Sequence, residues 1–330
     1  MTAPINVGLG FRVANDSQEA IRALDPRIEL VDLSALGSPK PIDDAGRQAL
    51  LERIAGVEVM VGANSIPAEY FAAAANLRWF QVINAGVEEL HANGTLARGF
   101  QVTTGAGIAA GPIAEHGIGL MLMLARSLHT SVRNMREQTW ERGFTSQLAG
   151  KTLGIVGLGE IGRAVARRAR PFDMRIIATR RNPGDGRDPD CDEVYAHTDL
   201  GELLARSDYL FIAAPLTPET RHMLSAAEFA QMKPTAFVIN VGRGEVIDQQ
   251  ALVRALESGQ IAGAALDVTD PEPLPPGHAL WSMPNVIITP HVAGAVEGYG
   301  HRAIGVFVAN LQRYLAGEPL SHVVDPVLGY

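Results

Sequence analysis

The sequence contains little that would connect this protein with an oxidising compartment, a nucleic acid or a membrane. One cysteine occurs in 330 residues, so an intramolecular disulfide is impossible. Lysine and arginine total 28 against 36 acidic residues, and the net charge of −8 argues against nonspecific nucleic-acid binding, which needs a basic surface. The most apolar segment, residues 118–125, is too short to span a bilayer. No signal peptide precedes the strand-like residues 5–9, and we therefore expect a cytoplasmic protein.

The single cysteine, Cys191, lies in the acidic run Asp188-Pro189-Asp190-Cys191-Asp192-Glu193. Neighbouring carboxylates disfavour the thiolate, which is the reactive form of cysteine. We therefore interpret Cys191 as a structural or incidental residue and not as a nucleophile. We also predict no metal site.

From about residue 152 onward, short aliphatic runs alternate with amphipathic segments. Such runs are typical of buried parallel strands, and the segments between them have helical spacing. The predicted strands cover residues 153–156, 175–178, 209–213, 236–241, 262–268 and 286–289, and the predicted helices include residues 161–169, 200–206, 226–232 and 249–257. This order predicts a doubly wound, Rossmann-type domain. Residues 182–192, rich in Pro, Gly and Asp, predict a solvated turn.

The first hundred residues show a shorter form of the same alternation, and a chain of this length usually forms two domains. Predicted strands at residues 5–9, 29–33, 57–62, 79–84 and 101–104 indicate a second α/β domain, which we predict to be flavodoxin-like. Residues 113–126 predict a largely buried connecting helix. Residues 303–315 also have helical spacing, and the pattern alone allows this helix to close the second domain or to return to the first.

The strand predicted at residues 153–156 leads into the turn Gly157-Leu158-Gly159-Glu160-Ile161-Gly162, and a helix follows at once. In this context the first two glycines allow a tight turn and close approach to a pyrophosphate, and the third allows the helix to pack closely. Free N–H groups at the helix N-terminus favour an anion. The pattern predicts a dinucleotide site; the alternative is a glycine turn with a purely structural role.

The end of the next predicted strand indicates which dinucleotide is bound. An NAD site usually has a carboxylate there for the ribose 2′-hydroxyl, whereas this chain has Thr179, Arg180 and Arg181. Guanidinium groups can bind a 2′-phosphate, and the Thr179 hydroxyl can add a donor. We therefore predict a preference for NADP(H), with NAD(H) possible. The alternative is that both arginines are solvated surface residues.

An arginine, a glutamate and a histidine follow three predicted strands of the C-terminal half. They are Arg243 in Asn240-Val241-Gly242-Arg243-Gly244, Glu272 in Asp270-Pro271-Glu272-Pro273, and His291 in Thr289-Pro290-His291. Open α/β sheets bind ligands at the carboxyl ends of their strands. There, Arg243 can hold an anionic substrate, His291 can move a proton, and Glu272 can orient the imidazole. Taken singly, each also reads as an ordinary loop residue, and we assign no such role to His116 or to the remaining histidines.

These motifs together resemble the D-2-hydroxyacid dehydrogenase family over nearly the whole chain. The resemblance rests on the segments at residues 157–162, 215–220, 240–244, 267–273 and 289–294, with Asn84-Ala85-Gly86-Val87 and Ala114-Glu115-His116 earlier in the chain. It implies that the dinucleotide domain, residues 102–293, is inserted into a substrate domain made of residues 1–101 and 294–330. The final helix then returns to the first domain, and the active site lies between the domains.

The resemblance also implies further contacts. Substrate contacts are expected from Arg243 and His291 and from the first-domain residues Gly62, Ala63, Gly86 and Val87. Beyond the glycine turn and the segment 179–181, dinucleotide contacts are expected from Ala214, Pro215, Thr220, Val241, Gly242, Asp267 and Gly294. A homodimer built around residues 114–136 is expected. Trp140 is expected at an interface or in the core, and the alternative is that it reaches the active site of the neighbouring subunit.

The function implied is NAD(P)H-dependent reduction of a small 2-keto acid, of the glyoxylate or hydroxypyruvate type, to the D-2-hydroxy acid. The hydride comes from the nicotinamide and the proton from His291. Two alternatives use the same residues. One is a phosphite-type dehydrogenase, and the other is a dinucleotide-sensing binding protein similar to the C-terminal-binding-protein corepressors. The absence of long flexible tails beyond the dehydrogenase core disfavours the second alternative.

Overall fold

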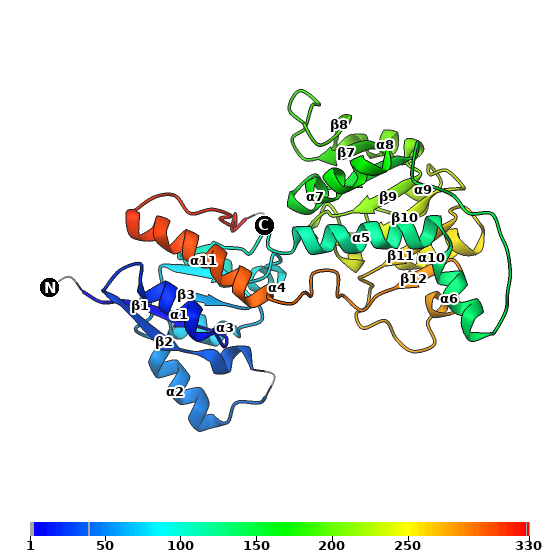
Figure 1. Cartoon of the computed structure of the whole chain (residues 1–330). Coiled ribbons are helices and arrows are strands. Elements are labelled where there is room, and N and C mark those ends of the chain that lie inside the picture. Colours follow the sequence, from blue (N-terminus) through cyan, green and yellow to red (C-terminus); the bar gives the residue numbers. More distant parts are fainter. Residues whose placement is uncertain (1–2, 39, 328, 330) are drawn as a thin grey trace. The chain divides into compact units, whose positions relative to one another are not determined.

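The aliphatic runs of the sequence form the strands of two parallel sheets. The computed structural model describes residues 3–38, 40–327 and 329, and the chain divides into two units (Figure 1). The first unit holds the chain up to Ile108 together with the segment from Glu297 onward, and the second spans Ala109–Val296. The domain boundary predicted after residue 101 cuts the strand Gln101–Thr103, whose pairing with its neighbour keeps it in the first unit.

The first unit has a five-stranded sheet of order β2-β1-β3-β4-β5, in which all neighbours are parallel. This is the flavodoxin-like order. Its strands are β1 (Ile5–Leu9), β2 (Ile28–Asp32), β3 (Val59–Gly62), β4 (Trp79–Val82) and β5 (Gln101–Thr103). Its helices are α1 (Asn15–Arg22), α2 (Asp44–Ile54), α3 (Ala68–Ala73), α4 (Glu88–Ala92) and α11 (Tyr299–Ala316), with the 3-10 turns η1 (Ser34–Gly37) and η2 (Thr95–Ala97).

The last helix, α11, belongs to the first unit, as the family resemblance implied and the pattern alone left open. It lies beside α1 (Figure 1). Phe307 is fully buried and stacks on Trp79 of β4, with ring centroids 5.2 Å apart. Buried Asn310 donates a hydrogen bond from Nδ2 to Gln81 Oε1 at 3.0 Å. The C-terminal segment therefore completes a core that the first hundred residues begin.

The second unit has a seven-stranded parallel sheet of order β12-β11-β10-β9-β6-β7-β8. The strands are β6 (Thr152–Val156), β7 (Arg175–Arg180), β8 (Glu193–Ala196), β9 (Tyr209–Ile212), β10 (Phe237–Asn240), β11 (Gly263–Leu266) and β12 (Val286–Ile288). Six of these match the predicted strands, and the edge strand β8 was not predicted. It pairs on one side only and carries Glu193 and Tyr195, so it lacks the aliphatic run by which buried strands are detected.

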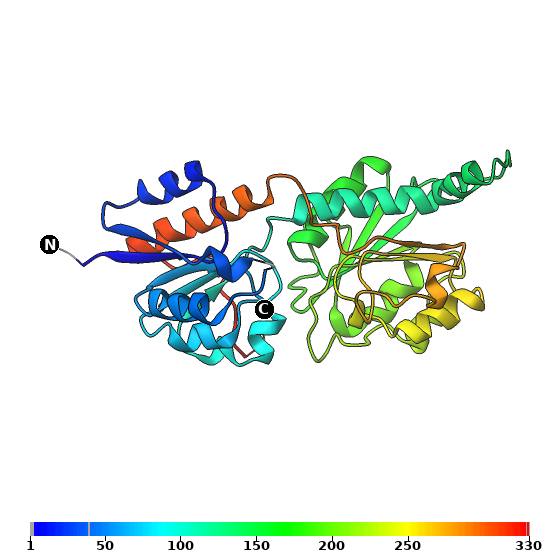
Figure 2. The same ribbon diagram turned by 90° about the horizontal axis from the view of Figure 1, so that it is seen from below.

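Helices cover both faces of this sheet (Figure 2). The buried core on one face includes α5 (Ala110–Ala125) and α7 (Glu160–Ala169), and the core on the other face includes α8 (Leu200–Arg206), α9 (Ala226–Phe229) and α10 (Gln249–Glu257). The short turns are η3 (Arg170–Phe172), η4 (His197–Asp199), η5 (Gly244–Val246) and η6 (Ala279–Trp281). Helix α5 approaches the sheet closely, since a Cβ at Gly117 would lie 2.4 Å from the ring of Phe211.

The turn predicted to be solvated at residues 182–192 is in part a buried, charged structure. The Asp188 side chain is only 3% exposed, because Arg163 of α7 binds it with Nη1 2.8 Å from Oδ2. Arg167 and Arg170 bind Asp190 and Asp192 in the same way. Cys191 is buried beneath these pairs, and burial, with the nearby carboxylates second, raises its pKa to about 12. This thiol is not a nucleophile at neutral pH, as predicted.

Helix α6 (Leu128–Arg136) and the segment after it expose large apolar side chains. Met135 is 72% exposed, Trp140 88% and Phe144 fully. Trp140 is therefore not a core residue. Within the described residues, no helix is long and apolar enough to cross a membrane.

Replacing Phe307 with alanine is expected to lower the free energy of unfolding of the first unit by about 3–5 kcal/mol, because a buried aromatic leaves a cavity. Urea unfolding followed by Trp79 fluorescence, with the exposed Trp140 and Trp281 changed to phenylalanine, measures this change. Val327→Ala, which shortens an 82% exposed side chain of the same unit, is the matched control, and its effect should stay within about 0.5 kcal/mol. Equal, small effects of both substitutions would show that α11 does not hold the first unit together.

Candidate active site

Three adjacent strands of the second unit carry the predicted catalytic residues at one edge of the sheet. Arg243 follows β10, Glu272 follows β11 and His291 follows β12, and these strands are neighbours in the order β12-β11-β10. Because all are parallel, their carboxyl ends lie at the same edge, where α/β sheets bind ligands. The loops of Arg243, Glu272 and His291 therefore all begin at the carboxyl edge of the sheet in the second unit.

Glu272 and His291 are in direct contact. His291 Nδ1 lies 2.9 Å from Glu272 Oε1, and the two side chains are 50% and 40% exposed. An ionised carboxylate only accepts hydrogen bonds, so Nδ1 carries the proton and donates. This bond orients the ring and leaves Nε2 for another partner. The geometry is that of an imidazole held by a carboxylate for proton transfer.

Arg243 is held by backbone contacts of its loop. The buried Asn240 side chain accepts a hydrogen bond from Gly242 N–H at 3.0 Å and donates one to the Arg243 carbonyl at 3.0 Å. A Cβ at Gly244 would lie 2.0 Å from the Thr269 carbonyl oxygen, so only glycine lets this loop lie against the segment that follows β11. A Cβ at Gly242 would lie 2.9 Å from the Ala214 carbonyl oxygen, so both glycines around Arg243 are structural, while the guanidinium supplies a permanent cation.

Asp267 organises the loop that carries His291. Its carboxylate is buried and accepts hydrogen bonds from Thr289 Oγ1 at 2.5 Å, from Val292 N–H at 3.0 Å and from Ala293 N–H at 2.9 Å. The His291 N–H donates to the Asp267 carbonyl at 2.8 Å. In the structure the Asp267 carboxylate binds the backbone of this loop. The predicted contact of Asp267 with a dinucleotide stays a prediction.

His116 of α5 also reaches this loop, although no role was predicted for it. Its Nε2 lies 3.0 Å from Thr289 Oγ1 and 3.6 Å from Asp267 Oδ1. The run Ala114-Glu115-His116 marked the helix in the sequence. Nothing in that run shows that its histidine meets a loop more than 170 positions later, because the contact depends on how α5 crosses the sheet.

The glycine turn after β6 has the backbone form of a dinucleotide site. Gly157 has φ of +97°, and a Cβ there would lie 2.8 Å from Ala214 N, at the switch point between β6 and β9. A Cβ at Gly162 would lie 2.4 Å from the Gly157 carbonyl oxygen, whereas one at Gly159 would meet nothing within 4 Å. Gly157 and Gly162 are therefore required by the fold, whereas Gly159 leaves open space before the N-terminus of α7. This turn fits a pyrophosphate.

Other members of the glycine turn and the adjoining loops have mixed exposure. Leu158 and Val241 are buried, while Glu160 is exposed at the start of α7. The Thr220 hydroxyl donates to the Pro215 carbonyl at 2.7 Å and so shapes the loop after β9. The remaining predicted contacts are Ile161 in the first turn of α7, Ala214 after β9, Gly242 after β10 and Gly294 after β12.

The residues at the end of β7 are partly paired within the protein. Arg180 donates from Nη2 to the Pro183 carbonyl at 2.9 Å, and its Nη1 lies 3.5 Å from Asp188 Oδ2. Arg181 is exposed. Thr179 is only 2% exposed, so its hydroxyl is not presented to a ligand, and we do not retain it as a phosphate donor. Its position inside the sheet, paired with β6 and β8, explains the burial.

The substrate contacts predicted in the first unit lie on two neighbouring loops. Gly62 ends β3 and Ala63 follows it, and Gly86 and Val87 lie between β4 and α4. Asn64 Nδ2 donates to the Gly86 carbonyl at 3.2 Å and connects the two loops. Val87 is buried, so it can offer only backbone groups to a ligand.

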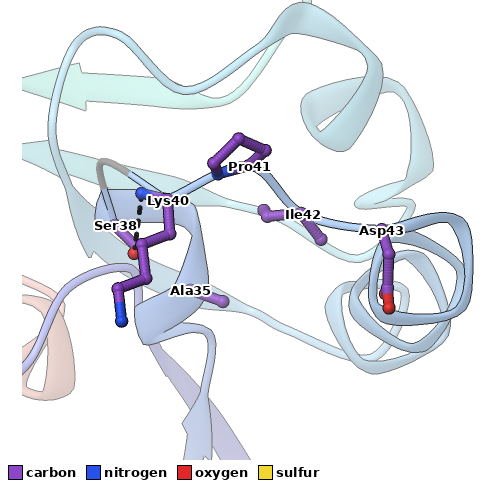
Figure 3. Close-up of a pocket in the computed structure, with 6 residues that line it drawn as sticks. All are labelled: Ala35, Ser38, Lys40, Pro41, Ile42 and Asp43. Carbon is purple, nitrogen blue, oxygen red and sulfur yellow. Dashed lines mark hydrogen bonds between the residues drawn. The ribbon is translucent and has the colours of Figure 1, made fainter.

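Two shallow hollows lie away from these residues. One, of about 340 Å³, is lined by Ala35, Ser38, Lys40, Pro41, Ile42 and Asp43 between η1 and α2 (Figure 3). The other, of about 290 Å³, lies beside the end of α5 and η3. Neither contains a predicted site residue. Among the described residues, no group of three or more His, Cys, Asp or Glu side chains is arranged for a metal.

Comparison with known proteins agrees with this geometry. Residues 118–293 match the family model "D-isomer specific 2-hydroxyacid dehydrogenase, NAD binding domain". The chain is 36% identical over 283 residues to a glyoxylate reductase of Thermofilum pendens, which covers 82% of each protein. It is 37% identical over 256 residues to a glyoxylate reductase/hydroxypyruvate reductase of Mus musculus, covering 76% of this chain and 77% of the relative.

The chain belongs to the D-isomer specific 2-hydroxyacid dehydrogenase family. It is an NAD(P)-dependent oxidoreductase with the two-domain fold of that family, a Rossmann-type domain inserted into a flavodoxin-like one. A solved family member from Xanthobacter autotrophicus in complex with NADPH and MES has a TM-score of 0.83 at 30% identity, with both chains fully covered. An NADPH-dependent glyoxylate/hydroxypyruvate reductase of Sinorhizobium meliloti, in complex with NADP and sulfate, has a TM-score of 0.81 at 28% identity, also with full coverage of both chains.

Two glycine substitutions in the turn after β6 should separate folding from ligand binding. Gly162→Ala places a Cβ against the Gly157 carbonyl and should lower the melting temperature by several degrees, since a clash of this kind costs roughly 1–3 kcal/mol. Gly159→Ala meets no protein atom, so it should leave the melting temperature unchanged and weaken dinucleotide binding at least about tenfold, because only the ligand approaches there. Calorimetry and fluorescence titration with NADPH measure the two effects. Unchanged NADPH affinity in Gly159→Ala would contradict the assignment of the turn.

Proposed function

We propose that this protein reduces a small 2-keto acid, of the glyoxylate or hydroxypyruvate type, to the D-2-hydroxy acid with NADPH. The observation that carries the proposal is the His291–Glu272 pair at the same sheet edge as Arg243 and the glycine turn. A proton donor, a fixed cation and a dinucleotide turn are the three elements that this reaction needs. The names of the relatives from Thermofilum pendens and Mus musculus support this substrate class.

Each residue has a separate task in the proposed mechanism. The nicotinamide, when bound, supplies the hydride to the carbonyl carbon. Arg243 binds the substrate carboxylate and polarises the keto oxygen, since its planar guanidinium offers several donors. His291 donates the proton from Nε2 to that oxygen as negative charge develops, and Glu272 holds the ring through Nδ1 and stabilises the charged imidazole.

Further substrate contacts are proposed from the first unit. The backbone groups of Gly86 and Val87, with Gly62 and Ala63 on the adjoining loop, are candidates to bind the substrate carboxylate. The buried side chain of Val87 and the bond between Asn64 and Gly86 support a role for the backbone alone. Glyoxylate and hydroxypyruvate carry no phosphate group, so their binding needs no cluster of basic residues.

The proposed preference for NADPH rests on the end of β7. No carboxylate stands at the end of that strand, where it would accept hydrogen bonds from a ribose 2′-hydroxyl, and Arg180 and Arg181 follow Thr179. Asp188 binds both Arg163 and Arg180, and Asp190 binds Arg163 and Arg167, so Arg180 is held at the strand end by a carboxylate that it shares with α7. The complexes of the relatives from Xanthobacter autotrophicus and Sinorhizobium meliloti with NADPH and NADP support the same preference.

We also propose that the protein forms a homodimer through α6 and the segment that follows it. Leu128, Val132, Met135, Trp140 and Phe144 are all exposed there. Apolar side chains gathered in this way mark interaction surfaces in soluble proteins. Sedimentation of the purified protein tests the proposal, and a monomer at micromolar concentration would overturn it.

The proposed reaction is tested by assaying glyoxylate, hydroxypyruvate and larger 2-keto acids with NADPH and NADH, and phosphite with NADP. Glycolate is achiral, so the product from hydroxypyruvate is the one that reports stereochemistry, and it should be D-glycerate. Turnover of phosphite without turnover of any 2-keto acid would replace the proposed reaction with the phosphite-type alternative.

Replacing His291 with glutamine should lower kcat for keto-acid reduction by roughly 10²–10⁴-fold, which is the usual contribution of a positioned proton donor. The Kd for NADPH should change by less than about twofold, because the imidazole acts on the substrate. His197→Gln, an exposed histidine elsewhere in the same unit, is the control and should keep the activity. Turnover of His291→Gln equal to that of the parent protein would remove His291 as the donor.

Replacing Arg180 with alanine should lower kcat/KM for NADPH by about 10–100-fold and change that for NADH little. A charge-assisted hydrogen bond to the 2′-phosphate contributes about 1.5–3 kcal/mol. Arg181→Ala is compared in the same assay, and Arg187→Ala, an exposed arginine of the following loop, is the control. Equal losses with both dinucleotides would mean that Arg180 has a structural task only.

A further inference from the structure

The backbone of the His291 loop is held in an unfavourable conformation. His291 has φ of +51°, in the left-handed region that residues other than glycine avoid and that costs about 1 kcal/mol or more. Three consecutive N–H groups hold it there, and all three bind Asp267. His291 N–H donates to the Asp267 carbonyl, while Val292 and Ala293 donate to the carboxylate. The direction of the imidazole thus depends on the position of one buried carboxylate.

Thr289 ties the same carboxylate to the strand from which the loop leaves. Its hydroxyl lies 2.5 Å from Asp267 Oδ1. A hydroxyl has one proton, and an ionised carboxylate has none to give, so Thr289 donates to Asp267. The lone pairs of Thr289 Oγ1 remain available to accept a hydrogen bond from a third group.

His116 supplies that third group from α5. Its Nε2 lies 3.0 Å from Thr289 Oγ1. Because the Thr289 proton is committed to Asp267, His116 must donate through Nε2–H. The chain therefore runs in one direction, from His116 Nε2–H to Thr289 Oγ1 and from Thr289 O–H to Asp267 Oδ1, and ends at the backbone of the His291 loop. The His116 side chain is 22% exposed, so most of the ring is shielded from water.

We propose that His116 and Thr289 are positioning residues that act through Asp267 to hold His291 in the orientation for proton transfer. The inference rests on the proposed role of His291 as proton donor. Neither residue needs to touch the substrate. His116 and Thr289 fix the backbone of the loop. His291 Nδ1 then stays within hydrogen-bond distance of Glu272, and His291 Nε2 keeps one direction toward the substrate. A displacement of about 1 Å at a reacting group can lower the rate about 100-fold.

Thr289→Val is the decisive substitution, because it keeps the shape of the side chain and removes the hydroxyl. We expect kcat to fall about 10–100-fold while KM for the keto acid and Kd for NADPH change less than about twofold. Thr289→Ser restores the hydroxyl and should recover at least about half of kcat.

His116→Phe should lower kcat about 3–10-fold, and His116→Gln, which keeps a donor, should recover most of it. His129→Phe is the matched control, since His129 Nδ1 bonds the Met123 carbonyl at 3.2 Å, and it should keep kcat.

A double-mutant comparison separates positioning from a general loss of structure. If Thr289 acts through His291, then Thr289→Val lowers kcat in the parent protein and has no further effect in the His291→Gln protein. A further loss of the same size in that background, or equal loss in Thr289→Val and Thr289→Ser, would overturn the proposal. Full activity of His291→Gln would instead overturn the proposed role of His291. Melting temperatures of all variants show that each one folds.

Discussion

The parallel alignment of β10, β11 and β12 is the constraint on which the site depends. Hydrogen bonds between these strands fix their register, with Asn240 beside Leu266 and Ala264 beside Val286. A parallel ladder places all carboxyl ends at one edge, so three loops that are distant in sequence start side by side. Each loop then needs only a few residues to present its side chain. The catalytic arrangement is thereby built on a rigid sheet.

The loops themselves are held by buried polar groups that never meet the substrate. Asn240 closes the loop of Arg243, and Asp267 closes the loop of His291. Both side chains are almost fully buried. Asn240 bonds the backbone, and Asp267 bonds the backbone and the Thr289 hydroxyl, with His116 Nε2 3.6 Å from its carboxylate. The exposed residues Glu272 and His291 can keep a defined geometry because the chain beneath them cannot move freely.

The acidic segment before β8 shows how local composition can mislead. Its Pro, Gly and Asp content is typical of a solvated turn, yet Asp188 is buried against Arg163 and Arg180. Opposite charge brought from α7 and β7 makes the burial possible. The same contacts orient Arg180, so the structure near a predicted phosphate contact is set by residues that a motif search does not include.

The sequence by itself determined the alternation of strands and helices, the two-domain α/β class and the identity of the chemically capable side chains. The aliphatic runs, the glycine turn at residues 157–162, and Arg243, Glu272 and His291 after their strands are local signals. The position of α11 in the first unit was implied by the family resemblance and is confirmed by the structure. Only the tertiary structure decided that β8 forms an edge of the sheet, that Thr179 is buried and that His116 meets Thr289. These features are contacts between segments far apart in the chain. They depend on packing and charge pairing, which leave no periodic signal in either segment alone.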